Sequence, residues 1–170
     1  MSEGSPTLDH QVVLMGPSGC GKSTVGQLLA RRAGVPFFEG DEFHSASHVE
    51  KMSQGRALQD EDREGWLQAL KEILRQHEGR PLVLACSALK QSYRETLSAG
   101  RAGLRFVFLQ GSRERLRERM RERAAQSEHF MPVSLLESQL AILEEPEPPA
   151  LTLSIELSPE EIVERILAAS

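Results

Sequence analysis

The sequence predicts an α/β domain with a mostly parallel sheet, and two observations lead to that prediction. Apolar runs alternate with helical patterns throughout the 170 residues, which favours parallel strands joined by helices. The segment Gly16–Ser23, with the sequence GPSGCGKS, fits the pattern G-x-x-x-x-G-K-S/T and lies between an apolar run and a helical pattern. That strand–loop–helix setting is the one in which the pattern binds phosphate groups. We find no internal repeat and no domain linker, so we expect residues 1–170 to form a single domain.

The expected strands are the short apolar runs that separate the helical patterns. The first, third and fourth are apolar along almost their whole length, as strands covered on both faces are. In chain order the five expected strands are Val12–Met15, Val35–Glu39, Leu82–Cys86, Phe106–Leu109 and Leu151–Ile155.

The expected helices follow these strands in turn. The last one has the clearest start, since Ser158 can cap it, Pro159 suits its first turn and Glu161 completes a capping box. The proline-rich stretch 144–149 cannot be helical and is expected to be a stiff connection. In chain order the seven expected helices are Lys22–Ala33, Ser47–Ser53, Asp60–His77, Lys90–Leu97, Ser112–Ala124, Pro132–Leu143 and Pro159–Leu167.

Composition narrows the classes of partner. The net charge of −5 argues against nucleic acid or a membrane surface as a partner, and no apolar run is long enough to span a bilayer. Residues 1–10 lack the basic and apolar regions of a signal peptide, so we expect a short flexible lead-in. Cys20 and Cys86 do not form a disulfide framework. A reducing cytoplasm is the simplest setting for such a chain.

The glycine-rich segment has a specific chemistry. Its glycines let backbone N–H groups curl around phosphate oxygens, and the following helix adds the partial positive charge of its N-terminus. Lys22 would bridge the β- and γ-phosphates of ATP, and the Ser23 hydroxyl would bind Mg²⁺. The alternative is a glycine-rich turn that caps a helix and binds nothing, but such a turn does not need Lys and Ser at this register. The expected ATP-binding residues are Gly16, Pro17, Ser18, Gly19, Cys20, Gly21, Lys22, Ser23 and Thr24.

The loop alone does not define the reaction, because GTPases, ATP-driven machines and small-molecule kinases share it. The chain has no base-reading N-K-x-D sequence, and its one D-x-x-G match, Asp62–Gly65, falls in a helical stretch. None of the apolar strands ends in the Asp of a Walker B motif. Asp41 is the best remaining carboxylate, because it follows the second strand and could face the same crevice as the loop. It could accept a proton from an attacking hydroxyl or orient a metal-bound water, or it could simply be a turn residue.

Several segments after the loop together resemble the gluconokinases, small P-loop kinases related to shikimate kinase and the nucleoside-monophosphate kinases. The resemblance covers about residues 12–146, and the order and spacing of its four blocks make it specific. The blocks are Gly40–His44; Glu50–Met52 with Gly55, Leu58–Arg63 and Trp66-Leu67; Ala85–Lys90 with Tyr93-Arg94; and His129–Met131 with Leu135-Leu136, Ser138-Gln139 and Leu143–Pro146.

The resemblance implies a three-layer P-loop NTPase fold with a five-stranded parallel sheet and a helical lid over about residues 112–131. It implies ATP-dependent phosphorylation of D-gluconate at its 6-hydroxyl, a step of carbohydrate acid catabolism, with Mg²⁺ as cofactor. It also implies a cytoplasmic enzyme that forms homodimers. ATP and gluconate are then the small-molecule partners.

A gluconate site needs cations for the carboxylate and polar side chains for the hydroxyls. Arg63 could grip the carboxylate with two hydrogen bonds, or it could pair with a neighbouring acid on a helix surface. His44 taken alone could be an ordinary exposed histidine. Trp66 is expected to pack beneath the site, and Cys86 to be a small buried residue rather than a nucleophile. With the resemblance, the expected substrate-binding residues are Asp41, His44, Lys51, Asp60, Arg63, Ser87, Lys90 and His129.

Residues 112–123 carry an arginine at every second position from Arg113 to Arg123. Most of these side chains are expected to form ion pairs on a solvated helix. Arg115, Arg119 and Arg123 share one helix face, and Leu116 and Met120 mark the packed side. In the related kinases, arginines of the lid stabilise the transferred phosphoryl group, and Arg119 and Arg123 match that R-x-x-x-R pattern. The catalytic residues implied are therefore Asp41, Lys22, Arg119 and Arg123, with Ser23 binding Mg²⁺ and Asp41 reaching it through water.

The chain departs from the family pattern in two places. Residues 124–128 form a longer connection before His129 than the family has, and Ser45 replaces the usual Pro after His44. Two other functions stay open: a kinase for another small sugar acid, polyol or shikimate-like acid, and a nucleotide-binding regulatory module without turnover.

Overall fold

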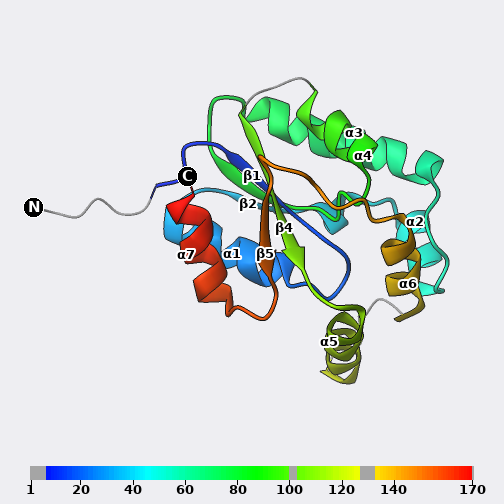
Figure 1. Cartoon of the computed structure of the whole chain (residues 1–170). Coiled ribbons are helices and arrows are strands. Elements are labelled where there is room, and N and C mark those ends of the chain that lie inside the picture. The colour runs from blue at the N-terminus through cyan, green and yellow to red at the C-terminus, as the bar shows by residue number, and fades with distance from the viewer. Residues whose placement is uncertain (1–6, 100–102, 127–132, 170) are drawn as a thin grey trace, which may run out of the picture.

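The computed structural model describes residues 7–99, 103–126 and 133–169. Within them, a parallel sheet of five strands lies between two layers of helices (Figure 1). The strand order is β2-β3-β1-β4-β5, with every neighbouring pair parallel. The strands are β1 Gln11–Met15, β2 Phe37–Glu39, β3 Leu82–Ala85, β4 Leu104–Gln110 and β5 Leu151–Ser154. The three-layer α/β fold predicted from the sequence is confirmed.

Alternation along β1 shows how the two faces of the sheet are covered. Val12 and Leu14 belong to the core under helices α1 and α7, whereas Val13 and Met15 belong to the core under α3 and α4. All four side chains are almost completely buried, because successive side chains of a central strand point to opposite covered faces. These helices are α1 Lys22–Ala33, α3 Asp60–Gln76, α4 Gln91–Ser98 and α7 Pro159–Ala168.

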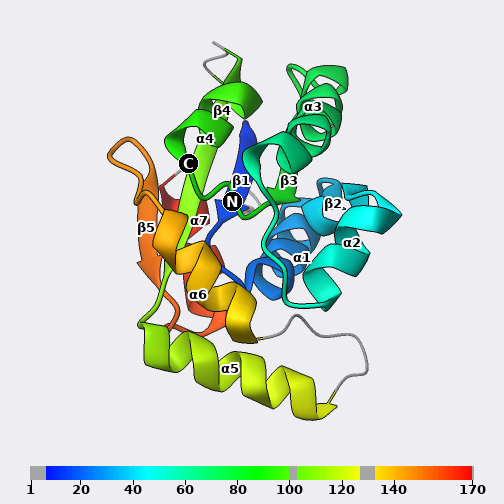
Figure 2. The ribbon, with the colours of Figure 1, turned by 90° about the vertical axis from the view of Figure 1, so that its right-hand side faces the viewer.

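The remaining helices lie at the carboxyl end of the sheet. Figure 2 shows α5 beyond the end of β4, with α6 alongside the sheet above it and α2 near α3. Their bounds are α2 Ala46–Ser53, α5 Arg113–Gln126 and α6 Val133–Ile142, and a 3-10 turn, η1, covers Gly40–Phe43. Within the described part of the chain, no helix is both long and apolar enough to cross a membrane.

The predicted elements agree with the structure apart from their ends and one turn. The second strand begins at Phe37 rather than Val35, because the Val35 amide closes the end of α1 on Ala30 O and Pro36 has no N–H. The fourth strand is longer than predicted, starting at Leu104, and the 3-10 turn η1 was not predicted. Of the expected flexible lead-in, residues 1–6 lie outside the described residues and Leu8 is buried in the core.

Candidate active site

The carboxyl ends of β1, β3 and β2 meet at one edge of the sheet. The Gly16 N–H, just after β1, donates to Ser87 O, just after β3, at 3.1 Å. A Cβ added to Gly40, just after β2, would lie 2.4 Å from Ala85 O, so only glycine allows this approach. The phosphate loop, the Cys86-Ser87 pair and Asp41 therefore lie together at the carboxyl ends of these strands, as the sequence predicted.

The phosphate loop wraps around the start of α1. Gly16, Gly19 and Gly21 have φ values of 144°, 86° and 96°, which residues with a side chain rarely adopt. Gly21 is the N-cap of α1 and has no side chain that could bond to the first amides of the helix. Those amides are therefore left directed into the loop. The Lys22 ammonium lies inside the loop and donates to Gly16 O at 2.8 Å and to Pro17 O at 3.2 Å. Such an arrangement of N–H groups and one cation suits the phosphates of a nucleotide.

A carboxylate that the sequence analysis had not selected lies against the loop. Ser23 Oγ donates a hydrogen bond to Oε2 of Glu39, the last residue of β2. Burial raises the pKa of Glu39, and the negative charge of Asp41 adds to this, while the Ser23 hydrogen bond opposes it. Its position as an acidic residue at the carboxyl end of an expected strand was the signal that could have identified it.

This pair fits the expected Mg²⁺. Hydroxyl and carboxylate oxygens are ligands that Mg²⁺ prefers, and the ion commonly takes one or two protein ligands and completes its shell with phosphate and water oxygens. Within the described residues, no group of three or more His, Cys, Asp or Glu forms a complete metal site of its own. Ser23 and Glu39 are thus the protein ligands that the geometry offers, with Asp41 two residues further on.

Asp41 lies in η1 and is exposed. The charge of Asp41 acts on Cys86, just after β3. Burial raises the pKa of the Cys86 thiol to about 12; the charges of Asp41 and Glu39 raise it further, and the charge of Lys22 lowers it. Cys86 is buried, and a raised pKa disfavours the reactive thiolate, which agrees with the expected small buried residue rather than a nucleophile. Asp41, Glu39 and Lys22 are thus close enough for their charges to act on one thiol just after β3.

Trp66 forms the support beneath this region, as predicted. Its side chain is buried, its indole N–H donates to Gly40 O at 2.7 Å, and its ring stacks on His44 with centroids 4.3 Å apart. Burial lowers the pKa of the His44 imidazole to about 4; the charges of His48 and Arg63 add to the effect and Asp41 opposes it. The buried His44 Nδ1 has no hydrogen-bond partner in the structure. His44 is therefore a neutral, oriented ring rather than an ordinary exposed histidine.

Arg63 lies on α3 facing α4, not in a surface ion pair along its own helix. Its Nη1 donates to Leu58 O at 2.8 Å and to the Tyr93 hydroxyl at 3.1 Å. Tyr93 in turn donates to Asp60, and Lys90 Nζ lies 3.0 Å from the same carboxylate. These hydrogen bonds lower the pKa of Asp60. Three predicted substrate residues, Asp60, Arg63 and Lys90, are thus assembled around Tyr93, whose role sequence reasoning had not recognised.

Lys51 takes a different partner from the other predicted cations. Its Nζ lies 2.7 Å from Oδ2 of Asp62, and this bond is the main cause of the lowered pKa of that carboxyl. His48 Nε2 lies 3.7 Å from the other Asp62 oxygen. Asp62 also accepts from the Gln59 N–H in the capping box of α3. Lys51 and His48 therefore connect α2 to the first turn of α3 through Asp62, the residue directly before Arg63.

The arginine-rich helix α5 packs on the phosphate loop through the face that the sequence predicted. Leu116 and Met120 are buried, and a Cβ added to Gly19 would lie 3.1 Å from Leu116 O and from Met120 Cγ. Arg119 donates to Ile155 O at 2.7 Å and to Cys20 O at 3.5 Å. Arg123 is exposed. Of the predicted lid 112–131, residues 127–131 lie outside the described residues, and so does the predicted substrate residue His129.

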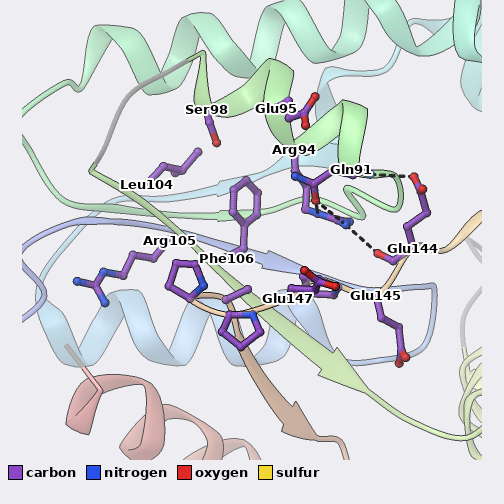
Figure 3. A pocket seen from close by; sticks show the side chains of 14 residues that line it. Gln91, Arg94, Glu95, Ser98, Leu104, Arg105, Phe106, Glu144, Glu145 and Glu147 are labelled. Atoms are coloured by element: carbon purple, nitrogen blue, oxygen red, sulfur yellow. Dashed lines mark hydrogen bonds between the residues drawn. The ribbon is translucent and has the colours of Figure 1, made fainter.

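A large hollow lies elsewhere among the described residues. It has a volume of about 940 Å³ and lies between α4, β4 and the connection 144–150. Figure 3 shows Arg94 at its wall, where the guanidinium donates to Glu144 O and to Gln91. Its lining contains none of the predicted site residues. The groups suited to phosphate chemistry lie at the carboxyl ends of the strands rather than in this groove.

The sheet, the phosphate loop and the arginine helix define a P-loop kinase, and the comparisons agree. The family model described as Shikimate kinase matches residues 18–169. A gluconokinase from Arabidopsis thaliana is 41% identical, with 98% of this chain and 95% of the relative covered. One from Gluconobacter oxydans is 44% identical, with 92% and 88% covered. The crystal structure of a gluconokinase from Sinorhizobium meliloti superposes with a TM-score of 0.84 at 44% identity, covering 96% of this chain and 92% of that one.

The chain therefore belongs to the gluconokinases, within the shikimate-kinase-like family of P-loop kinases. This confirms the resemblance drawn from the four sequence blocks.

Proposed function

We propose that the protein transfers the γ-phosphoryl group of ATP to the 6-hydroxyl of D-gluconate. The observation that carries the proposal is the meeting, at the carboxyl ends of the strands, of the phosphate loop, Asp41 and a third group. That group is Asp60, Arg63 and Lys90 around Tyr93, which we call the acceptor wall. The loop supplies a donor site and the wall supplies cations for a small acid. Identity of 41–44% to gluconokinases over nearly the whole chain supports gluconate as that acid.

On the donor side, the loop amides and Lys22 bind the phosphates of ATP, with Lys22 bridging the β- and γ-phosphates. Ser23 and Glu39 would hold Mg²⁺, which would neutralise phosphate charge and orient the triphosphate. Arg119 lies against Cys20 on the α5 side of the loop, and we propose that it and Arg123 stabilise charge on the transferred group. In such reactions, positioning and charge stabilisation supply almost all of the rate enhancement.

On the acceptor side, Asp41 faces the hydroxyl that attacks phosphorus. The O–P bond to gluconate forms as the bond to the β-phosphate oxygen breaks, and ADP leaves. The hydroxyl proton passes to the Asp41 carboxylate, or Asp41 orients the hydroxyl and the proton leaves later.

Recognition of the gluconate carboxylate is assigned to Arg63. Its Nη1 is fixed by Leu58 O and the Tyr93 hydroxyl, and no bond from its Nε or Nη2 is found within the described residues. A planar guanidinium held in this way presents its remaining donors in the fork that binds a carboxylate. Lys90 and Lys51 add positive charge, and His44, Asp60, Ser87 and His129 are proposed to contact the hydroxyls.

An acceptor panel tests the proposal. ATP-dependent phosphorylation is measured with D-gluconate, other aldonates, shikimate and nucleoside monophosphates at equal concentrations. We expect gluconate to give the highest kcat/KM, with 6-phosphogluconate and ADP formed one to one. Good turnover of another acceptor with none of gluconate would refute the assignment and favour the kinase of a related sugar acid or polyol.

We also propose that the enzyme is a cytoplasmic homodimer. The resemblance to gluconokinases supports the dimer, and two buried, unpaired cysteines suit a reducing compartment. Light scattering after gel filtration tests the dimer, with the mass of two 18.9 kDa chains expected.

A further inference from the structure

Three consecutive residues of the phosphate loop contact two helices that lie far along the chain. The Ser18 N–H donates to Oε1 of Gln139, on α6, at 2.7 Å. Gly19 lies directly under α5, and Cys20 O accepts from Arg119 of α5. The outer side of the loop is therefore held by both helices, while Gly21 and Lys22 are left to face the phosphates.

The two helices are also joined to each other. Glu137 on α6 accepts a short hydrogen bond from Arg117 of α5, and the Nε of Arg113 lies 3.5 Å from its other oxygen. Glu137 and Gln139 are two residues apart, so they point to different sides of α6. Together these contacts form a closed ring. Gln139 of α6 bonds to the loop, Glu137 of α6 bonds to Arg117 of α5, and Arg119 of α5 bonds back to the loop.

The ring is anchored to the rest of the site by the ends of α6. Beyond its C-terminus, the Glu144 N–H donates to Leu89 O at 2.8 Å, and Arg94 donates to Glu144 O at 2.8 Å. Near its start, Leu135 packs with Met52 and Leu58 in a small core of its own. α6 and the residues after it thus contact Leu58 before α3, Leu89 between β3 and α4, and the loop, and can hold α5 in a fixed place relative to all three.

We propose that Gln139 and Glu137 are positioning residues for phosphoryl transfer, which hold the phosphate loop and the arginine helix in register. The inference rests on the proposed function for its reaction, but the ring itself is a property of the fold. If Gln139 is released from Ser18, the loop can shift relative to Arg119 although every group that touches the nucleotide is still present. Small displacements of this kind lower the rate of transfer more than they weaken binding.

Two substitutions of one residue separate this role from simple packing. Gln139→Met keeps the length of the side chain but removes the acceptor, and Gln139→Glu keeps an acceptor for the Ser18 N–H. We expect Gln139→Met to lower kcat on the order of tenfold, with the KM for ATP changed less than threefold. Gln139→Glu should recover most of kcat at saturating ATP, with a raised KM because of its negative charge near the triphosphate. Ser138→Ala, on the same helix outside the ring, is the control and should match the wild type.

Hydrogen exchange of the loop provides a readout that does not depend on the acceptor. The amides of residues 18–20 should exchange faster in Gln139→Met and also in Glu137→Gln, which does not touch the loop, but not in Ser138→Ala. If the wild type fails to phosphorylate gluconate, the proposed function fails while this test of the ring still stands. Unchanged loop exchange in Glu137→Gln would overturn the ring. Wild-type kcat with tighter ATP binding in Gln139→Met would also overturn the proposal. In that case Gln139 would only compete with a phosphate oxygen for the Ser18 N–H and would not position the loop.

Discussion

Glu39 and Asp41 are carboxylates two residues apart, but their surroundings differ. Glu39 is half-buried, bonded to Ser23, and has a pKa raised mainly by burial. Asp41 is exposed on a 3-10 turn beside the acceptor wall. Pairs of carboxylates in unlike environments commonly take different roles in one reaction. We propose that, in this enzyme, Glu39 serves the metal ion and Asp41 serves the acceptor hydroxyl.

The His44 ring is expected to stay neutral across the working pH range. Its pKa of about 4 lies below the unfolded value near 6.5. The unfolded chain therefore binds the proton first as the pH falls, so stability is fully present above about pH 6.5 and is lost between 6.5 and 4. NMR titration of the ring should show no protonation above about pH 5.5. His44→Gln should reduce the loss of stability between pH 6.5 and 4, and a His44 titration near pH 6.5 would contradict the account.

Arg94 is expected to be important for stability rather than catalysis. It is buried, with Nη1 bonded to Ala88 O and Nη2 to Glu144 O. Arg94→Leu leaves both carbonyl oxygens without this donor and should lower the free energy of unfolding by about 2–4 kcal/mol. Arg94→Lys should recover little, because a point charge cannot reach both carbonyls.

Urea unfolding of both variants measures this effect. Arg105→Leu is the matched control, since Arg105 is exposed on the far side of the same groove (Figure 3). An equal loss of unfolding free energy in Arg94→Leu and Arg105→Leu would show that the Arg94 hydrogen bonds do not contribute specifically to stability.

For helix α5, sequence patterns predicted which residues share a face but not which partners they contact. The spacing of Leu116 and Met120 predicted its buried face, and the spacing of Arg115, Arg119 and Arg123 predicted a shared face. The different partners of these three arginines were not predictable, because most of the partners lie far away in the sequence. Arg119 contacts the loop and Ile155 O, Arg115 pairs with Glu118 and Glu156, and Arg123 is exposed.

Arg119→Ala is expected to lower kcat by about a hundredfold or more, and to raise the KM for ATP far less. The reason is that a cation beside the transferred phosphoryl group acts mainly in the transition state. Arg121→Ala is the control, as Arg121 is an exposed arginine of the same helix. Steady-state kinetics with ATP varied at saturating gluconate separate the two constants. A rise in KM with kcat unchanged would indicate ground-state binding only.

At the scale of the whole molecule, the sheet order decides which residues meet. Periodicity and capping signals predicted nearly every helix and strand, because those signals are local. The order β2-β3-β1-β4-β5 is set by how the crossovers pack, so the bond between Gly16 and Ser87 and the ring through α6 could not be read from spacing. Glu39 was overlooked for a related reason: only the placement of β2 beyond β3 brings its carboxyl to Ser23.

The central claim is that a donor loop and an acceptor wall meet at Asp41 in a working kinase. Asp41→Asn tests it most directly, because the change preserves shape and removes the negative charge and the basicity. We expect turnover of gluconate to fall by about 10²–10⁴-fold, while the dissociation constant for a non-hydrolysable ATP analogue changes less than threefold. Wild-type turnover in Asp41→Asn would contradict the role of Asp41. Tight binding of ATP without turnover in the unmodified protein would instead indicate a nucleotide-binding module and overturn the kinase itself.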